Sequence, residues 1–150
     1  QDSTQTKPKN LFWISGGHGL AAWGLSGNYL HNNDLFTVRY HHYHVNSEQS
    51  NFFLYEDKSV LYGKVFINKN RNILLSFSLG LGMINITETE NVFLGHTVRT
   101  EQKFLNIPVE SQIIFLPFKF MGIGLKAFAN INSYSVSGWG LITLQFGKLK

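Results

Sequence analysis

The chain has 150 residues, a formal net charge of +4 at pH 7 and no cysteine, which excludes a disulfide framework and thiol chemistry. Its 13 Lys and Arg residues are scattered without a basic run, so no nucleic-acid partner is expected. Aromatic residues account for 15% of the chain and charged residues for only 15%, against roughly 25% charged in soluble domains, which indicates a surface not wholly in contact with water.

The hydrophobic pattern along the chain predicts strands. No apolar run approaches the roughly 20 residues of a membrane-spanning helix. Residues 1–10 form a polar tail, and residues 11–150 are expected to form one domain in which apolar residues alternate with period two. Eight strands are predicted, at residues 10–17, 20–31, 34–46, 58–68, 72–85, 103–115, 118–131 and 136–149.

The lengths of the connections also follow a pattern. Short turns are predicted at 32–33, 69–71 and 116–117, whereas the connections at 47–57 and 86–102 are long and polar. Transmembrane barrels have short periplasmic turns and longer external loops, and an even strand number puts both termini on the periplasmic side. The predicted fold is therefore all-β, an eight-stranded antiparallel up-and-down transmembrane β-barrel with both termini periplasmic.

Several of the predicted strands have one large apolar face and one small or polar face, as in "NILLSFSLGLGMIN" at residues 72–85. Such strands can wrap a dry core, as in a soluble lipocalin-like carrier, or face lipid around a polar lumen. Mid-strand charges favour the second arrangement, because a buried charge must be paired or solvated. The predicted lumenal polar plug comprises Arg39, Lys64, Glu110, Gln112 and Lys126. Its three cations and one anion are unbalanced, and either water or a further partner group is expected to compensate.

The lipid-facing residues carry further signals. Four aromatic residues lie near predicted periplasmic strand ends, where membrane barrels carry aromatic girdles. These lipid-interface aromatics are Tyr29, Phe36, Phe115 and Phe146. A stripe of small outward residues, which would let a neighbouring protein approach closely, is predicted at Ala21, Gly27, Gly63 and Ala127.

Half of the six histidines fall in "RYHHYHV" at residues 39–45. Neighbours on a strand point to opposite faces, so His42 and His44 share a face and His41 points away from them. His42 and His44 are weak candidates for metal ligands, since a zinc site needs at least one more ligand. The favoured interpretation is that both extend the lipid-facing row into the membrane interface, and no metal or other cofactor is predicted.

The segments "LFWISGG", "NDLFTVRY", "IPVESQIIFLPFKFMGIGL" and the closing "GLITLQFGKLK" resemble small eight-stranded outer-membrane β-barrel proteins, in particular uncharacterised barrels of Bacteroidota-type bacteria. The resemblance implies the barrel fold and a location in the outer membrane of a Gram-negative bacterium. It implies membrane lipids and lipopolysaccharide as partners, with other outer-membrane proteins as further candidates.

The resemblance supplies no activity. Barrels of the lipid A 3-O-deacylase class carry a His and a Ser two positions apart on a strand, and His41, His42 and His44 have no such Ser. The favoured interpretation is a non-enzymatic barrel that serves as a structural or accessory subunit of a larger outer-membrane complex. The alternatives are a lipid A-modifying outer-membrane enzyme and a soluble lipocalin-like carrier.

Overall fold

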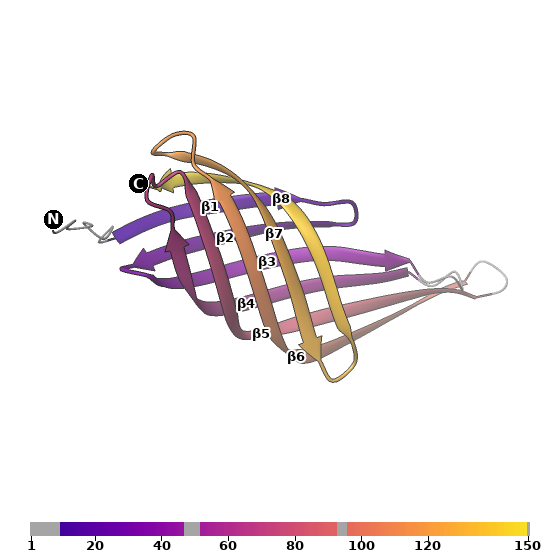
Figure 1. Ribbon diagram of the computed structural model, residues 1–150. Helices are drawn as coiled ribbons and strands as arrows, with labels where there is room; N and C mark the ends of the chain where they lie inside the picture. Colours follow the sequence, from indigo (N-terminus) through magenta and orange to yellow (C-terminus); the bar gives the residue numbers. More distant parts are fainter. Residues whose placement is uncertain (1–9, 47–51, 93–95, 150) are drawn as a thin grey trace, which may run out of the picture.

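The chain forms a closed barrel in the computed structural model, which describes residues 10–46, 52–92 and 96–149. Each strand pairs antiparallel with its sequence neighbours, and the first pairs with the last (Figure 1). The strands are β1 (Asn10–His18), β2 (Ala22–His31), β3 (Asp34–Asn46), β4 (Phe52–Ile67), β5 (Ile73–Val92), β6 (His96–Phe115), β7 (Met121–Asn132) and β8 (Val136–Lys148). The predicted eight-stranded antiparallel fold is thus confirmed.

The two ends of the barrel differ. The start of β1, the end of β8 and three short turns lie at one end, which we call the turn end (Figure 1). The end of β1 and the start of β8 lie at the opposite end, which we call the hairpin end. Of the predicted tail, residues 1–10, only Asn10 is described, and it begins β1. Among the described residues, no helix is long and apolar enough to cross a membrane.

The barrel is apolar outside and polar inside. Ile107, Ile123 and Leu144 point outward and are 44–46% exposed, whereas Arg39 is 2% exposed and Glu110 is 4% exposed. A soluble carrier would need the opposite arrangement, because apolar surface in water is unfavourable and carriers hold apolar ligands inside. The predicted orientation of the apolar faces is therefore confirmed, and it is the orientation of a barrel surrounded by lipid.

Side chains fill the interior in three layers, as expected for a barrel of this strand number. Apolar side chains around Trp13, Leu30 and Ile114 close the turn end. A second apolar cluster around Tyr43, Ile84 and Phe128 closes the hairpin end. Buried polar residues lie between them, including Ser15, Ser26, Asn28, Thr37, Arg39, Asp57, Ser59, Ser76, Asn106, Glu110, Gln112, Lys126, Asn130, Thr143 and Gln145.

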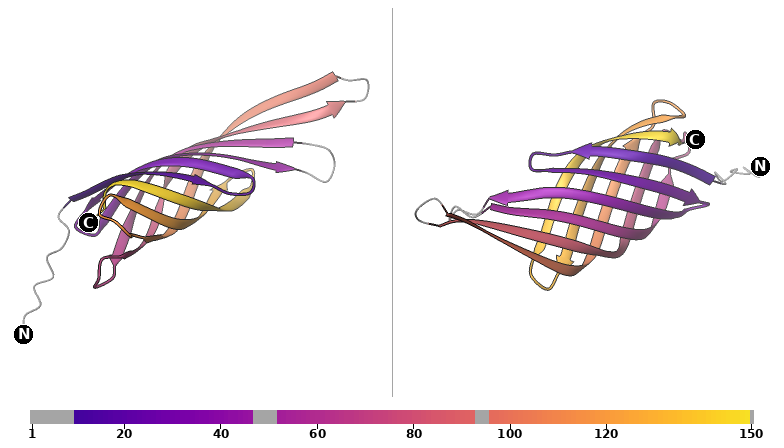
Figure 2. Two further views of the ribbon diagram at one scale, coloured as in Figure 1. Left: turned by 90° about the horizontal axis from the view of Figure 1, so that it is seen from above. Right: turned by 180° about the vertical axis from the view of Figure 1, so that it is seen from behind.

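Strands β3 to β6 continue past the barrel as a projecting sheet (Figure 2). The predicted long loops at 47–57 and 86–102 are wrong in this respect, since all of their described residues are strand. Residues 47–51 and 93–95 lie outside the described residues. The polar composition of these segments suggested loops, but beyond the bilayer a strand needs no apolar face, and β-branched Thr87 and Thr100 favour extended backbone.

This inside-out arrangement predicts how the wall tolerates charge. Val60 lies on the outer wall between Val38 and Leu81, whereas Val98 lies on the part of β6 that pairs only with β5. Val60→Arg should lower the free energy of unfolding by roughly 2–4 kcal/mol in phospholipid vesicles. The matched control Val98→Arg should change it by less than roughly 1 kcal/mol. Denaturant titration measures both, and equal effects would contradict the assignment of the wall to lipid.

Candidate functional site: the polar layer inside the barrel

Arg39 is the centre of the polar layer. Strand β3 directs it inward, and its guanidinium donates to Asp57 Oδ2 from Nε at 3.0 Å and from Nη2 at 2.7 Å. It also donates to Glu110 Oε2 at 2.9 Å and to Asn130 Oδ1 at 2.6 Å. The ring of Phe128 lies 5.2 Å from its central carbon. Arg39 thus connects β3, β4, β6 and β7 across the lumen.

The two carboxylates have further partners. Lys126 Nζ lies 3.1 Å from Glu110 Oε1 and 3.3 Å from Ser26 Oγ. Asp57 Oδ1 accepts hydrogen bonds from Asn106 Nδ2 at 3.0 Å and from the hydroxyl of Ser59. Buried charges are stable only with such complete pairing, because the desolvation cost of an unpaired one is several kcal/mol.

The layer is balanced in charge, with Arg39 and Lys126 facing Asp57 and Glu110. Four residues of the predicted plug, Arg39, Glu110, Gln112 and Lys126, are buried in the lumen. Asp57 supplies the anion that the predicted set lacked. The sequence reasoning missed it because it placed residue 57 in a loop, although the excess of cations in the predicted set already indicated that a compensating group was missing.

The placement of Lys64 in the lumen is wrong. Lys64 points outward near the turn end, where its ammonium pairs with Asp34, and Tyr62 donates a hydrogen bond to the same carboxylate. The face was misjudged because inward Leu61 and Val65 are apolar too. Alternation therefore does not distinguish the two sides of β4 at this point.

His41 occupies the hairpin side of the layer. Its ring is fully buried, lies 4.2 Å from that of Phe128, and fits against Gly24, where a Cβ atom would come within 2.1 Å of it. Neither ring nitrogen has a hydrogen-bond partner among the described residues, and Gln112 Oε1 has none either. The inward position of His41, opposite to His42, agrees with the sequence prediction.

His42 and His44 lie on the outer side near the hairpin end. The His42 ring stacks on Trp23 at 5.4 Å, and its Nδ1 lies 4.0 Å from Glu56. The His44 ring stacks on Phe52 at 5.6 Å. Within the described part of the chain, no group of three or more His, Cys, Asp or Glu residues is arranged to hold a metal ion.

Aromatic residues surround the turn end. Tyr29, Phe36, Phe115 and Phe146 are exposed on the outer wall, as expected from the sequence. Tyr29 and Phe36 are directly paired across β2 and β3, and the Phe36 ring lies 5.4 Å from that of Tyr62. Phe118 and Phe120 extend the girdle to the turn between β6 and β7, with their rings 5.8 Å apart.

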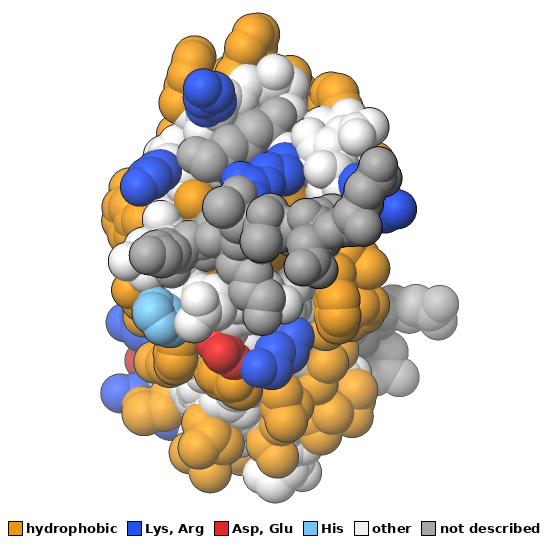
Figure 3. Space-filling view, turned by 60° about the vertical axis from the view of Figure 1, so that its left-hand side comes forward, with side chains coloured by type: hydrophobic (Ala, Val, Ile, Leu, Met, Phe, Trp, Pro, Cys, Tyr) orange, Lys and Arg blue, Asp and Glu red, His pale blue; other side chains and the backbone are white. Residues whose placement is uncertain are grey.

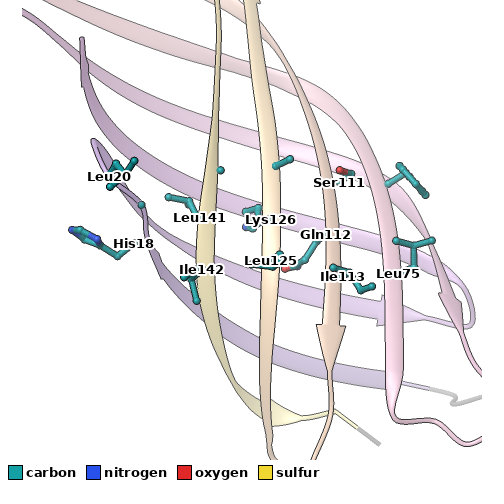
Figure 4. Close-up of a pocket in the computed structure, with 14 residues that line it drawn as sticks. His18, Leu20, Leu75, Ser111, Gln112, Ile113, Leu125, Lys126, Leu141 and Ile142 are labelled. Carbon is teal, nitrogen blue, oxygen red and sulfur yellow. The ribbon is translucent and has the colours of Figure 1, made fainter. Parts of the chain in front are cut away.

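A shallow depression in the outer wall runs across β5 to β8, between Leu75, Ile113, Leu125 and Ile142 (Figure 4). Small residues Ser111, Ala127 and Gly140 lie side by side along it. The predicted stripe of small outward residues is wrong for two of its four members. Its Gly63 points inward, with the Phe77 carbonyl where a side chain would be, and its Ala21 lies outside the strands.

No protein-family model matches the sequence, and no curated protein matches it. Solved structures do match. Neisserial surface protein A is similar, with a TM-score of 0.63 and 11% identity over 94% of this chain and 96% of its own. The outer-membrane protein Ail of Yersinia pestis, in a phospholipid bilayer nanodisc, has a TM-score of 0.57 and 16% identity over 92% of this chain and 99% of its own.

The N-terminal β-barrel domain of OprF from Pseudomonas aeruginosa has a TM-score of 0.55 and 15% identity, over 93% of this chain and 97% of that domain. At these identities the likeness shows the fold alone. The chain is thus an eight-stranded outer-membrane β-barrel by fold, and the predicted location in a Gram-negative outer membrane agrees with this fold and with the apolar wall. The narrower resemblance to Bacteroidota-type barrels stays a prediction.

The pairing of Arg39 predicts a large effect of its removal. Arg39→Met leaves Asp57 without its buried cation and Glu110 paired with Lys126 alone. It should lower the free energy of unfolding by roughly 3–5 kcal/mol, because a buried charge is left uncompensated. The control Lys64→Met removes a cation from the outer side and should have a much smaller effect. Denaturant titrations in vesicles compare the two variants. A larger effect of Lys64→Met would contradict the assignment of Arg39 to the lumen and of Lys64 to the outer side.

The packing of His41 predicts a contrast between two glycines of β2. Gly24→Ala places a methyl group against the buried ring, whereas the outward Gly27 has no atom within 4 Å of an added Cβ. Gly24→Ala should cost roughly 1–3 kcal/mol, and Gly27→Ala should be nearly neutral. The double variant Gly24→Ala/His41→Ala should be less unstable than additivity of the two single changes predicts. Strict additivity would argue against the contact.

Proposed function

We propose that the chain is a non-enzymatic barrel of the outer membrane, with its turn end toward the periplasm, that serves as a structural or accessory subunit of a larger outer-membrane complex. The observation that carries this proposal is the projecting sheet at the hairpin end, because it presents a strand edge that the barrel itself leaves unpaired.

The edge belongs to β6. Pairing of β6 with β7 begins at Asn106 and Asn132, so that residues 96–105 pair with β5 alone. A closed barrel has no strand edges, and an exposed edge is a template for another strand. A partner protein could add a strand there, with backbone hydrogen bonds giving affinity and alternate side chains giving specificity.

The interior supports a structural role for the barrel itself. Its four buried charges bind one another, and apolar clusters close both ends. Eight-stranded barrels have an interior just wide enough for side chains to fill, whereas porins have about twice as many strands. The polar layer therefore acts as an internal brace that holds the strands in register while the projecting sheet makes contacts outside.

Shortening the projecting sheet tests the proposal. A two-residue Asn-Gly turn can replace residues 87–101 and join Ile86 to Gln102, which are already paired. The variant should still form the barrel, shown by its heat-dependent gel migration, but should migrate as a lone chain after gentle detergent extraction from native membranes. The full-length chain should migrate in a larger complex.

A matched control keeps the strand edge and removes one positive and one negative side chain from it. Arg99 and Glu101 form a 3.0 Å ion pair on the projecting β6 and are both well exposed. Arg99→Gln/Glu101→Gln should leave the complex intact, because backbone pairing does not need these side chains. A full-length chain that migrates alone, or a shortened chain that keeps its complex, would count against the proposal.

A further inference from the structure

The turn end carries a concentration of cations that the polar layer does not explain. Figure 3 looks toward this end and shows several Lys and Arg side chains on it, with hydrophobic side chains around them. We call Lys69, Arg71, Lys119 and Lys148 the basic arc. Lys69 and Arg71 belong to the turn between β4 and β5, Lys119 to the turn between β6 and β7, and Lys148 ends β8.

Hydrogen bonds connect these three segments into one rigid rim. The Asn68 side chain accepts from the backbone N–H groups of Asn72 and Ile73 at 2.9 and 3.0 Å, which fixes the first turn. Leu116 N–H donates to the Asn72 carbonyl at 2.7 Å, joining that turn to the next. Leu149 N–H then donates to the Lys119 carbonyl at 2.9 Å. The cations are thus held along a continuous arc from β4 to β8.

The charge along the barrel is asymmetric. Among the described residues at the turn end, the one carboxylate is that of Asp34, which already binds Lys64 and Tyr62. The outward-facing charges at the hairpin end are mixed, with Glu56 and Glu101 close to Lys58, Arg99 and Lys103 in the strand pairing. The turn end therefore presents the main field of positive potential on the described surface.

The aromatic girdle sets the depth of the basic arc. Lys119 stands between Phe118 and Phe120, whose exposed rings are stacked on each other. The exposed Phe115 and Phe146 lie on the strands just before these turn-end residues, since they directly precede Leu116 and Gly147 in the sequence. Aromatic side chains of membrane barrels lie at the interface, so cations just beyond them lie at the level of lipid headgroups.

We propose that the basic arc binds the phosphate headgroups of anionic phospholipids, of the phosphatidylglycerol type, in the leaflet around the turn end. The inference rests on the membrane location in the proposed function, but not on the complex. Cations spread along a rim suit several headgroups side by side, and each Lys or Arg near an anionic membrane surface adds to the attraction. The exposed rings next to them are positioned to contact the acyl chains of the same lipids.

Lipid selectivity of the purified, reconstituted chain tests the proposal. Electron paramagnetic resonance of spin-labelled lipids measures the preference for phosphatidylglycerol over phosphatidylcholine, which should be at least roughly threefold. Lys69→Gln/Lys119→Gln/Lys148→Gln should reduce it to about one. Arg71 stays unchanged in this variant, since it contacts other groups of the fold.

The matched control removes the same charge from the opposite end. Lys58→Gln/Arg99→Gln/Lys103→Gln should keep the preference, with heat-dependent gel migration showing that both variants are folded. An equal loss in both variants would mean that net charge alone attracts the lipids, and would overturn the proposal. So would loss of the wild-type preference on adding millimolar inorganic phosphate at constant ionic strength, because the arc would then be a site for free phosphate.

The lipid measurement is independent of the complex. If the triple variant of the arc loses lipid selectivity but still migrates in the larger complex, the two proposals hold separately. If the shortened-sheet variant fails to dissociate while lipid selectivity behaves as expected, the accessory role alone fails.

Discussion

The pairing of β1 with β8 is the constraint on which the rest of the structure depends. Lipid cannot hydrogen bond to peptide groups, so a sheet can cross a bilayer only when no strand edge remains there. Seven residue pairs, from Phe12↔Lys148 to His18↔Ile142, close the sheet. Closure at this strand number leaves a narrow interior, and the narrow interior determines which side chains can point inward.

Small residues are the first consequence of that narrow interior. A Cβ atom on Gly82 would come within 2.1 Å of the buried Ser59 hydroxyl oxygen, and one on Gly24 would collide with His41. Large groups such as Arg39 fit only where their neighbours are small. Once inside, a guanidinium needs complete pairing, and Asp57, Glu110 and Asn130 provide it from three other strands. The pairing within the polar layer therefore follows from the closing of the sheet into a narrow barrel.

Outside the bilayer the constraint no longer applies. Strands β5 and β6 continue beyond the last pairing of β6 with β7, and water can satisfy the free edge of residues 96–105. The same molecule therefore combines a closed barrel, in which neighbouring strands are paired, with a projecting sheet, in which residues 96–105 of β6 form an exposed strand edge. The turn end is the third region, where the aliphatic outer surface gives way to exposed aromatic side chains and then to the cations of the basic arc.

The sequence by itself determined the properties that repeat along each strand. Period-two alternation in "NILLSFSLGLGMIN" identifies a strand and its lipid face, and short turns between such segments establish the up-and-down order. These features are local, because neighbouring residues on any strand point to opposite sides. The aromatic positions Tyr29, Phe36, Phe115 and Phe146 follow from the same pattern, and so does the inward direction of Arg39.

Only the tertiary structure decided which charges meet. Arg39 and Glu110 are 71 positions apart, and Asp57 reaches them from a segment whose polar composition suggested a loop. Lys64 was assigned to the wrong side because β4 has apolar residues on both faces near the turn end, where the interior is an apolar cluster. Contacts across a barrel depend on the register of all eight strands together, and no short stretch of sequence contains that information.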